Sequence, residues 1–329
     1  MKKLILLFLI INCQLFIVNC AFGTAYTWTG TTSTAWNTST NWTPSGVPTT
    51  SDNVTINQAS GNMPVLDTVR TITNLTLSRG TLDLGGYTLT ATGTISASGS
   101  SATSRAINNG VFIGTGASIS LSRVTFGAKL DLTSVSPTVE LSVLNNVCKL
   151  TKTGSGSAAS YGGNKFADSL FITHSGSGPF YVGSGVSDTC NAPIVLKTTS
   201  TGYIYMAYGS NAHRYNGNLN IDITGGGGVS FGNEGGSKRA SLASGKDLTV
   251  TNLSSGTLAM YGLSMDGSGT VSISGSSTSS ILFGSTNVVV NRKIIASAGI
   301  VSLNGGTYNA PLNFTVQGAA QCSWYGVTR

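Results

Sequence analysis

The feature that most constrains the fold of this chain is an internal repeat. Three consecutive segments, starting at Asn164, Asp188 and His213, read NKFADSLFITHSGSGPFYVG, DTCNAPIVLKTTSTGYIYMA and HRYNGNLNIDITGGGGVSFG. Their starts are almost evenly spaced, and apolar residues recur at the same five positions. The five columns are Phe166, Cys190 and Tyr215; Leu170, Ile194 and Leu219; Ile172, Leu196 and Ile221; Phe180, Ile204 and Val229; Val182, Met206 and Phe231. Such a period predicts a stacked array of one structural unit.

Within each segment the apolar residues come in pairs separated by one residue, such as Leu219 and Ile221. This alternation is typical of a half-buried strand, and the Gly, Ser and Thr residues after each pair are typical of turns. One such unit cannot bury its own apolar face, whereas stacked units bury a continuous core. The pattern therefore predicts an all-β fold, a right-handed single-stranded parallel β-helix.

Looser copies extend the pattern in both directions. Val271 and Ile273 follow Leu248 and Val250 at almost the same spacing as in the three clear repeats. We expect the repeats to fill residues 57–329 and to be cut in mid-repeat at the end. Asparagines recur after the first apolar column, and at a repeated corner an asparagine bonds its own backbone or the copy in the next coil. These asparagines are Asn191, Asn216 and Asn309.

Residues 26–56 differ from the repeats and contain Trp28, Trp36 and Trp42. Because a solenoid exposes the end of its core, it needs an atypical terminal unit. We expect these tryptophans to form an N-terminal cap. The alternative is a sugar-binding patch, because indole rings also stack on sugars.

Residues 1–25 have the pattern of a secretory signal, with Lys2 and Lys3 followed by an apolar stretch. Gly23 and Ala25 fit a cleavage site that leaves Tyr26 first. Alternatively, Cys20 carries a lipid anchor, although Asn19 before it disfavours lipidation. We expect a bacterial protein that is secreted or held at the outer cell surface, touching a membrane only through that anchor.

Composition narrows the function further. Charged residues make up 9% of the chain, and the net charge of +7 includes Lys2 and Lys3. Because the remaining basic residues are scattered, we expect no nucleic-acid partner.

Cys148, Cys190 and Cys322 remain after the signal, and we expect them to be buried apolar residues, with a disulfide between two of them as the alternative.

The segments TWTGTTSTAWNTSTNW and GVPTTSDNVTI, together with YNGNLNIDITGGGG and ASLASGKDLTV, resemble large repetitive surface proteins of Bacteroidetes and β-helical autotransporter-like passengers. The resemblance implies an adhesin-like or structural role at the cell surface, with no catalytic residue to carry over. Such proteins often end in a sorting domain for type IX secretion. None is visible here, so the resemblance implies either a fragment of a longer protein or another export route.

Parallel β-helices also carry polysaccharide-acting enzymes, which need grouped acidic residues. The acids here are solitary in sequence, and Asp222 and Asp247 occupy different phases of the repeat. His174 and His213 also differ in phase, and we interpret them as solvated loop residues. We therefore predict no catalytic, cofactor-binding or metal-binding residue, no cofactor and no enzymatic activity.

The remaining surface feature is a group of tyrosines. If Ile204 and Met206 face inward, Tyr203 and Tyr205 face outward, with Tyr181 one coil away and Tyr208 nearby. Outward aromatic residues on a flat sheet favour contact with a glycan or with a host or neighbouring cell surface, whereas a ladder that only stabilises adjacent coils needs no ligand.

We predict a non-enzymatic structural or adhesin-like surface protein. The alternative is a polysaccharide-acting enzyme or glycan-binding module on a pectin-lyase-like β-helix. A third interpretation, an ice-binding face, needs outward Thr columns in register, and the Ser and Thr positions drift between the repeats.

Overall fold

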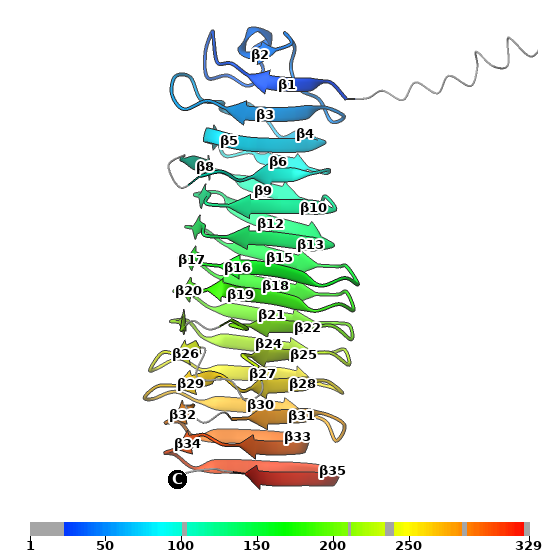
Figure 1. Ribbon diagram of the computed structural model, residues 1–329, viewed down its shortest axis with the longest axis vertical. Coiled ribbons are helices and arrows are strands. Elements are labelled where there is room, and N and C mark those ends of the chain that lie inside the picture. The colour runs from blue at the N-terminus through cyan, green and yellow to red at the C-terminus, as the bar shows by residue number, and fades with distance from the viewer. Residues whose placement is uncertain (1–22, 101–103, 210–211, 234–239, 285–287, 326–329) are drawn as a thin grey trace, which may run out of the picture.

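The computed structural model describes residues 23–100, 104–209, 212–233, 240–284 and 288–325. Of the predicted signal, residues 1–25, the first 22 residues, including Cys20, lie outside these ranges. The chain forms a parallel β-solenoid of about 11 turns (Figure 1), as the repeats predict. Its strands stack in three parallel series, which we call faces 1, 2 and 3. The described ranges hold no helix long and apolar enough to span a bilayer.

Face 1 contains the outward tyrosines. Its strands are β1 (Ala25–Trp28), β3 (Asn53–Asn57), the first part of β5 (Asn74–Asp83), β7 (Ile95–Ala97), β10 (Ser118–Ser122), β13 (Ser136–Glu140), β16 (Ala158–Gly162), β19 (Phe180–Val186), β22 (Tyr203–Met206), β25 (Gly228–Phe231), β28 (Thr257–Met260), β31 (Ser280–Phe283) and the second parts of β33 (Ile294–Asn304) and β35 (Leu312–Tyr325).

Face 2 follows face 1 along each coil and has the shortest strands. It begins with the second part of β5 and continues with β8 (Arg105–Asn108), β11 (Thr125–Phe126), β14 (Val143–Leu144), β17 (Lys165–Phe166), β20 (Thr189–Cys190), β23 (His213–Tyr215), β26 (Ala240–Leu242), β29 (Leu263–Met265), β32 (Val289–Val290) and β34 (Thr307–Tyr308).

Face 3 completes the coil. Its strands are β4 (Arg70–Ile72), β6 (Thr88–Ala91), β9 (Val111–Gly114), β12 (Lys129–Ser134), β15 (Cys148–Lys152), β18 (Leu170–His174), β21 (Ile194–Thr198), β24 (Leu219–Ile223), β27 (Leu248–Leu253), β30 (Val271–Gly275) and the first parts of β33 and β35.

All five predicted apolar columns are confirmed. In each column the three residues occupy the same register on adjacent strands, for example Phe166 beside Cys190 and Cys190 beside Tyr215. All fifteen side chains are buried in one continuous core. The alternation of apolar and polar residues therefore fixes which side of each strand faces inward.

Coil length varies more than the repeats suggest. One short coil runs from Leu130 to its register partner Cys148, whereas a coil more than half as long again runs from Leu219 to Leu248. The first three positions of β24 and β27 nevertheless pair in order, and the register shifts only between Ile221 and Asp222. At one corner the predicted asparagine contact is present, because Asn216 Nδ2 donates to Asn191 Oδ1 over 2.8 Å. Asn309 instead donates to Asn291 Oδ1 over 2.8 Å, a partner that the sequence pattern missed.

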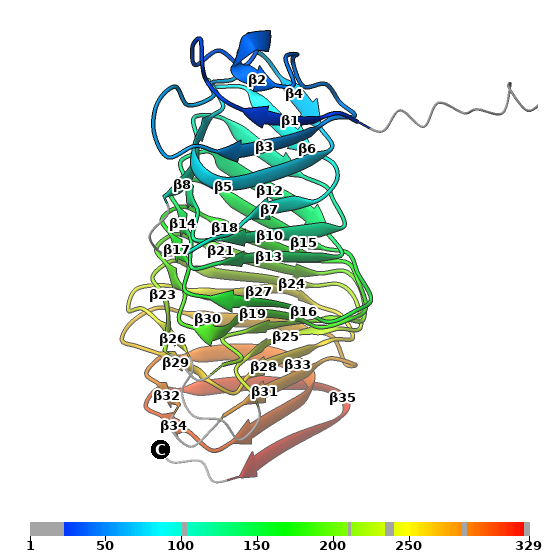
Figure 2. The same ribbon diagram turned by 45° about the horizontal axis from the view of Figure 1, so that its top comes forward.

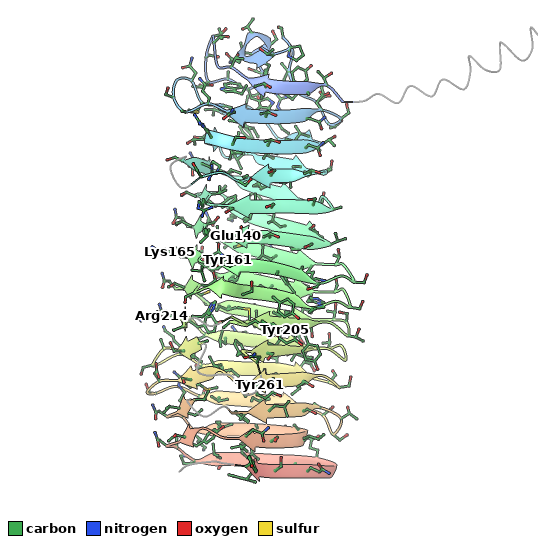
Figure 3. The ribbon with its side chains drawn as sticks, viewed as in Figure 1. Glu140, Tyr161, Lys165, Tyr205, Arg214 and Tyr261 are labelled. Carbon is green, nitrogen blue, oxygen red and sulfur yellow. The ribbon has the colours of Figure 1, made fainter. Side chains whose placement is uncertain are left out.

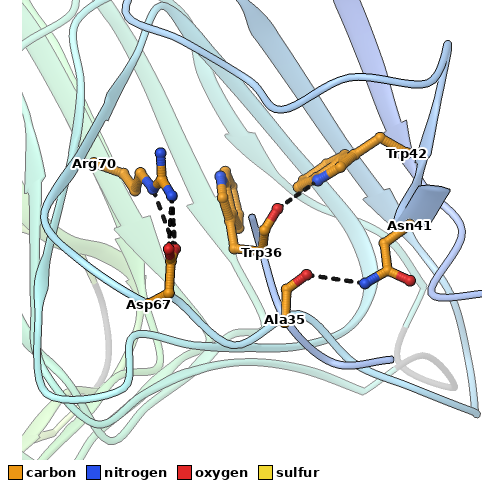
Figure 4. Close-up of polar contacts among 6 residues, drawn as sticks. All are labelled: Ala35, Trp36, Asn41, Trp42, Asp67 and Arg70. Carbon is orange, nitrogen blue, oxygen red and sulfur yellow. Dashed lines mark hydrogen bonds and ion pairs between the residues drawn. The ribbon is translucent and has the colours of Figure 1, made fainter. Parts of the chain in front are cut away.

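The tryptophan-rich segment closes the N-terminal end (Figure 2). Strand β1 pairs in parallel with β3 and antiparallel with β2 (Trp42–Thr43), which follows the short 3-10 helix η1 (Ser39–Asn41). Trp36 and Trp28 both contact Trp42 edge to face, with ring centroids 4.7 and 4.8 Å apart. Trp42 Nε1 donates to the Trp36 carbonyl oxygen over 2.8 Å (Figure 4).

All three indoles are buried. The cap is therefore as expected, and the alternative interpretation of these tryptophans as a sugar-binding patch is wrong, because no indole face is open to a ligand.

Candidate functional site

Polar side chains form a column inside the solenoid at the corner between faces 1 and 2, which we call the corner column. Its members are Ser142, Asn164, Asp188 and His213, one from each of four consecutive coils, and all are buried. Each side chain accepts a hydrogen bond from a backbone N–H of the preceding coil. These bonds join Val124 N to Ser142 Oγ (3.1 Å), Ser142 N to Asn164 Oδ1 (3.1 Å), Asn164 N to Asp188 Oδ1 (2.8 Å) and Asp188 N to His213 Nδ1 (3.0 Å).

Burial shifts the protonation equilibria of the last two members. It raises the pKa of Asp188 to about 7, although hydrogen bonds from Asn164 act in the opposite direction. Burial lowers the pKa of His213 to about 4, so its ring is neutral at pH 7 and Nδ1 can accept a hydrogen bond. Asp188 Oδ2 lies 3.8 Å from His213 Nδ1. Because both residues are buried and bonded to backbone, we assign them a structural role.

The second histidine lies at the corner between faces 3 and 1. His174 stands in register between Lys152 and Thr198, and all three are buried. His174 Nε2 lies 2.6 Å from the Gly178 carbonyl oxygen, and Ser200 Oγ lies 3.4 Å from Nδ1. The interpretation of both histidines as solvated loop residues is therefore wrong. Their rings fit inside because glycines of neighbouring coils, Gly202 and Gly183, leave room for them.

The cysteines are only partly as expected. Cys148 and Cys190 are buried, and burial raises the pKa of both thiols above the usual range, whereas Cys322 is exposed. Cys148 faces inward from β15 and Cys190 from β20, on different faces. All three thiols are free. The prediction that Cys322 is buried is wrong, because it lies on β35, which has a neighbouring strand on one side only among the described residues.

Asp222 and Asp247 do not meet in register. Asp222 stands beside Asn252 rather than Asp247, and it forms an ion pair of 3.1 Å with Lys197 on face 3. Asp247 Oδ1 accepts hydrogen bonds from the Thr270 backbone and hydroxyl. Among the described residues, no three His, Cys, Asp or Glu side chains are grouped so that they could hold a metal ion.

The four predicted ligand-contact tyrosines do come together. Tyr181 on β19 and Tyr205 on β22 stack with centroids 4.9 Å apart, and Tyr203 stacks on Tyr205 at 5.7 Å. Tyr208 contacts Tyr181 at 4.7 Å with tilted rings and Tyr205 at 5.4 Å edge to face. We call these four residues the tyrosine surface. Tyr181, Tyr203 and Tyr205 are half-buried and Tyr208 is 38% exposed, so the cluster is both a ladder between coils and an accessible apolar area.

Two local features position these rings. Tyr203 lies against Gly228 of the next coil, where any side chain would collide with the ring. Tyr208 leaves the strand after Ala207, whose φ of 56° turns the chain at the corner. Partial burial, with the neighbouring tyrosines as smaller causes, raises the pKa of Tyr205.

Sequence reasoning missed a fifth tyrosine on the same face. Tyr161 on β16 is 50% exposed, and its ring lies against Gly185 of the next coil (Figure 3). The signal for it is the same outward phase that identifies Tyr181, but an irregularity between β16 and β19 shifts the register after Ser160.

Face 1 has a different surface towards the N-terminus. Hydroxyl side chains occupy one outward register position on five consecutive coils, with no hydrogen bond from their hydroxyls to any described residue. We call this series the hydroxyl column; its members are Thr55, Thr76, Ser96, Ser120 and Thr138. The expected drift of Ser and Thr positions is therefore wrong for these coils, because the five residues pair in register from strand to strand although the coils differ in length.

Comparison with known proteins adds one match. The model of a family described as a domain of unknown function (DUF8693) matches residues 27–166, less than half of the chain. No curated protein matches the chain, and no solved structure does. The matched segment includes the tryptophan cap, the hydroxyl column and Tyr161, and it ends before the tyrosine surface.

Proposed function

We propose that this chain is a non-enzymatic, adhesin-like surface protein that binds carbohydrate through the tyrosine surface. The observation that carries the proposal is the placement of four partly exposed aromatic rings within two adjacent coils of a flat parallel sheet. Tyrosine combines a large apolar ring with a hydroxyl, which suits contact with sugars. A rigid solenoid supports such a surface because its residues are held by packed strands on both sides.

The buried polar residues support a binding role over an enzymatic one. A glycoside hydrolase needs two carboxyl groups facing one substrate, and a lyase of this fold needs several carboxylates for calcium. Among the described residues, the buried carboxylate of Asp188 accepts a hydrogen bond from the Asn164 backbone N–H, and Asp222 forms an ion pair with Lys197. A secreted or outer-surface location remains a proposal that rests on residues 1–25, and so does a lipid anchor at Cys20. Mass spectrometry of the mature N-terminus tests both.

A glycan array probed with the exported chain tests the binding proposal. We expect binding to a defined set of oligosaccharides, with loss of at least about tenfold in affinity for Tyr208→Ala and for the Tyr203→Ala/Tyr205→Ala double variant. The matched control is Tyr87→Ala/Tyr325→Ala, because Tyr87 and Tyr325 are 41% and 80% exposed but lie outside the surface. Equal binding by all variants, or no binding by the wild type, would contradict the proposal.

The hydroxyl column supports a second candidate function, contact with ice. Its hydroxyls repeat about every 4.8 Å from coil to coil, and the next outward position on each strand lies about 6.6 Å away. Asn53, Asn74, Ser118 and Ser136 occupy that neighbouring position, so polar groups form a two-dimensional array. We expect the wild type to show thermal hysteresis. Thr76→Tyr should lose it, and Thr151→Tyr on face 3 should retain it. Absence of hysteresis in the wild type excludes this function.

A further inference from the structure

Tyr161 provides an aromatic surface of a different kind from the tyrosine cluster. The rings of Tyr181 and Tyr205 stack on each other, so each covers part of its neighbour. Tyr161 has no ring neighbour within the described residues, and one side of its ring lies on the backbone at Gly185. Half of the residue is exposed, so part of the ring is accessible to solvent. A sugar ring stacks best on an aromatic face that is held from behind and open in front.

Cationic side chains lie on face 2, across the corner from Tyr161. Lys165 on β17 and Arg214 on β23 are exposed and share one register column, with Thr189 between them. Two coil spacings separate them by about 9.6 Å. In Figure 3 both lie at the left margin of the view, to one side of Tyr161 and Tyr205. Neither forms an ion pair with a described residue, so their charges are not neutralised within this part of the chain.

The acids near these two cations are buried or half-buried, whereas the cations are exposed. Glu140 lies on face 1 one coil before Tyr161, and Figure 3 shows the two close together in the view. Its half-buried carboxylate would repel an anion bound at Tyr161. Asp188 lies between Lys165 and Arg214 in the sequence, but its side chain is buried in the corner column and points to backbone N–H groups. Asp222 is paired with Lys197 on face 3. Asp168 follows Lys165 by three residues and is also half-buried, and its Oδ1 accepts a hydrogen bond from Ser169 N. Two exposed cations therefore accompany the exposed ring of Tyr161, whereas the two accompanying carboxylates, Glu140 and Asp168, are half-buried.

We propose that Tyr161, Lys165 and Arg214 form a subsite for an anionic sugar unit, next to the tyrosine surface. This inference rests on the proposed carbohydrate-binding function and names its ligand class. The sugar ring stacks on Tyr161, and its carboxylate or sulfate group lies towards Lys165 and Arg214. Lysine and arginine both donate charge-assisted hydrogen bonds to such groups.

Three soluble polymers test the proposal by calorimetry with the exported chain: dextran, which is neutral, polygalacturonate, which carries carboxylates, and dextran sulfate. We expect the wild type to bind at least one anionic polymer about tenfold or more tightly than dextran at low salt, and the preference to shrink as salt rises. Preference for only one anionic polymer identifies the anionic group. Lys165→Gln/Arg214→Gln should lose the preference, whereas binding to dextran stays unchanged.

The matched control removes the same charge from face 3. Lys129 and Lys149 are exposed on β12 and β15, and Lys129→Gln/Lys149→Gln should keep the wild-type preference. If both double variants lose the anionic preference equally, the attraction is to net charge only and the subsite is refuted. Equal binding of all three polymers also refutes the subsite, but it does not contradict carbohydrate binding by the tyrosine surface. If the anionic preference survives in Tyr203→Ala/Tyr205→Ala with unchanged affinity, the tyrosine surface fails and the subsite stands. If the wild type binds none of the polymers, the subsite is refuted.

Discussion

The backbone N–H of Asp188 donates to Nδ1 of His213 over 3.0 Å, so each coil at this corner is held to the next by a side chain that points along the stacking direction. The same contact is made by Asn164 and Ser142 in the preceding coils. Buried polar groups that lose such partners cost about 1–3 kcal/mol each. The corner column thus links protonation to the stability of the central coils.

Asp188→Asn tests the acidic member of the column. The folded-state pKa of Asp188 is raised to about 7, so its stabilising contribution is complete when the carboxyl is protonated, below its unfolded pKa of 3.8, and is lost as pH rises through 7. Asparagine keeps an oxygen for the Asn164 N–H and cannot ionise. Between pH 4 and pH 8 the free energy of unfolding of the variant, measured with denaturant, should rise relative to that of the wild type by up to about 4 kcal/mol. A constant difference across that range would refute the assignment.

His213 gives the opposite pH dependence. Its folded-state pKa is lowered to about 4, so its contribution is complete above the unfolded pKa of 6.5 and is lost as pH falls towards 4. His213→Ala should lower stability at pH 8, because the Asp188 N–H loses its acceptor, and should have less effect at pH 4. Unfolding of the wild type and the variant at the two pH values measures this, and an equal loss at both would contradict it.

Gly183→Ala tests the packing of His213. Gly183 has a φ of 69°, and a methyl group there would overlap the imidazole ring. We expect a loss of about 2 kcal/mol or more from backbone strain and collision together. Gly156→Ala is the matched control, because nothing lies within 4 Å of its added methyl group. Similar melting temperatures for the two variants would show that the collision is relieved at little cost.

Trp36→Ala tests whether the cap stabilises only its own end. Trp36 is fully buried, and its removal should cost about 3–5 kcal/mol. Because each coil contacts only its neighbours, the loss should be local. Hydrogen exchange should quicken in residues 25–77 and stay unchanged in residues 240–284. Trp324→Ala, which removes an indole that is 57% exposed, should leave exchange near the cap unchanged. Faster exchange throughout the chain would show that the solenoid melts as one unit.

The sequence allowed prediction of the apolar columns because their alternation is strict: Phe180, Ile204 and Val229 each stand two residues from the next inward side chain. The corner column could not be found in this way. Its members are four different residue types, and their spacing follows corners of unequal length. Asp188 and His213 resemble solvated residues in the sequence. Only the stacking of strands shows that their polar atoms accept hydrogen bonds from backbone N–H groups and not from water.

The tyrosine surface was predictable for the same reason as the core, since Tyr203 and Tyr205 alternate with Ile204 and Met206. Tyr161 was not, because the register irregularity between β16 and β19 decides where its ring lies. Its exposed ring lies against Gly185, which the pattern presents only as a turn residue.

The short coil from Leu130 to Cys148 and the long coil from Leu219 to Leu248 each occupy one place in the stack. Each coil therefore adds one strand spacing, about 4.8 Å, to the length of the molecule whatever the number of residues in it. Axial distance in the solenoid therefore depends on the number of coils and not on the number of residues. Lengthening a corner widens the molecule locally and leaves the separation of Tyr161 from the cap unchanged. The position of any ligand-binding side chain along the axis is thus set by the number of coils before it.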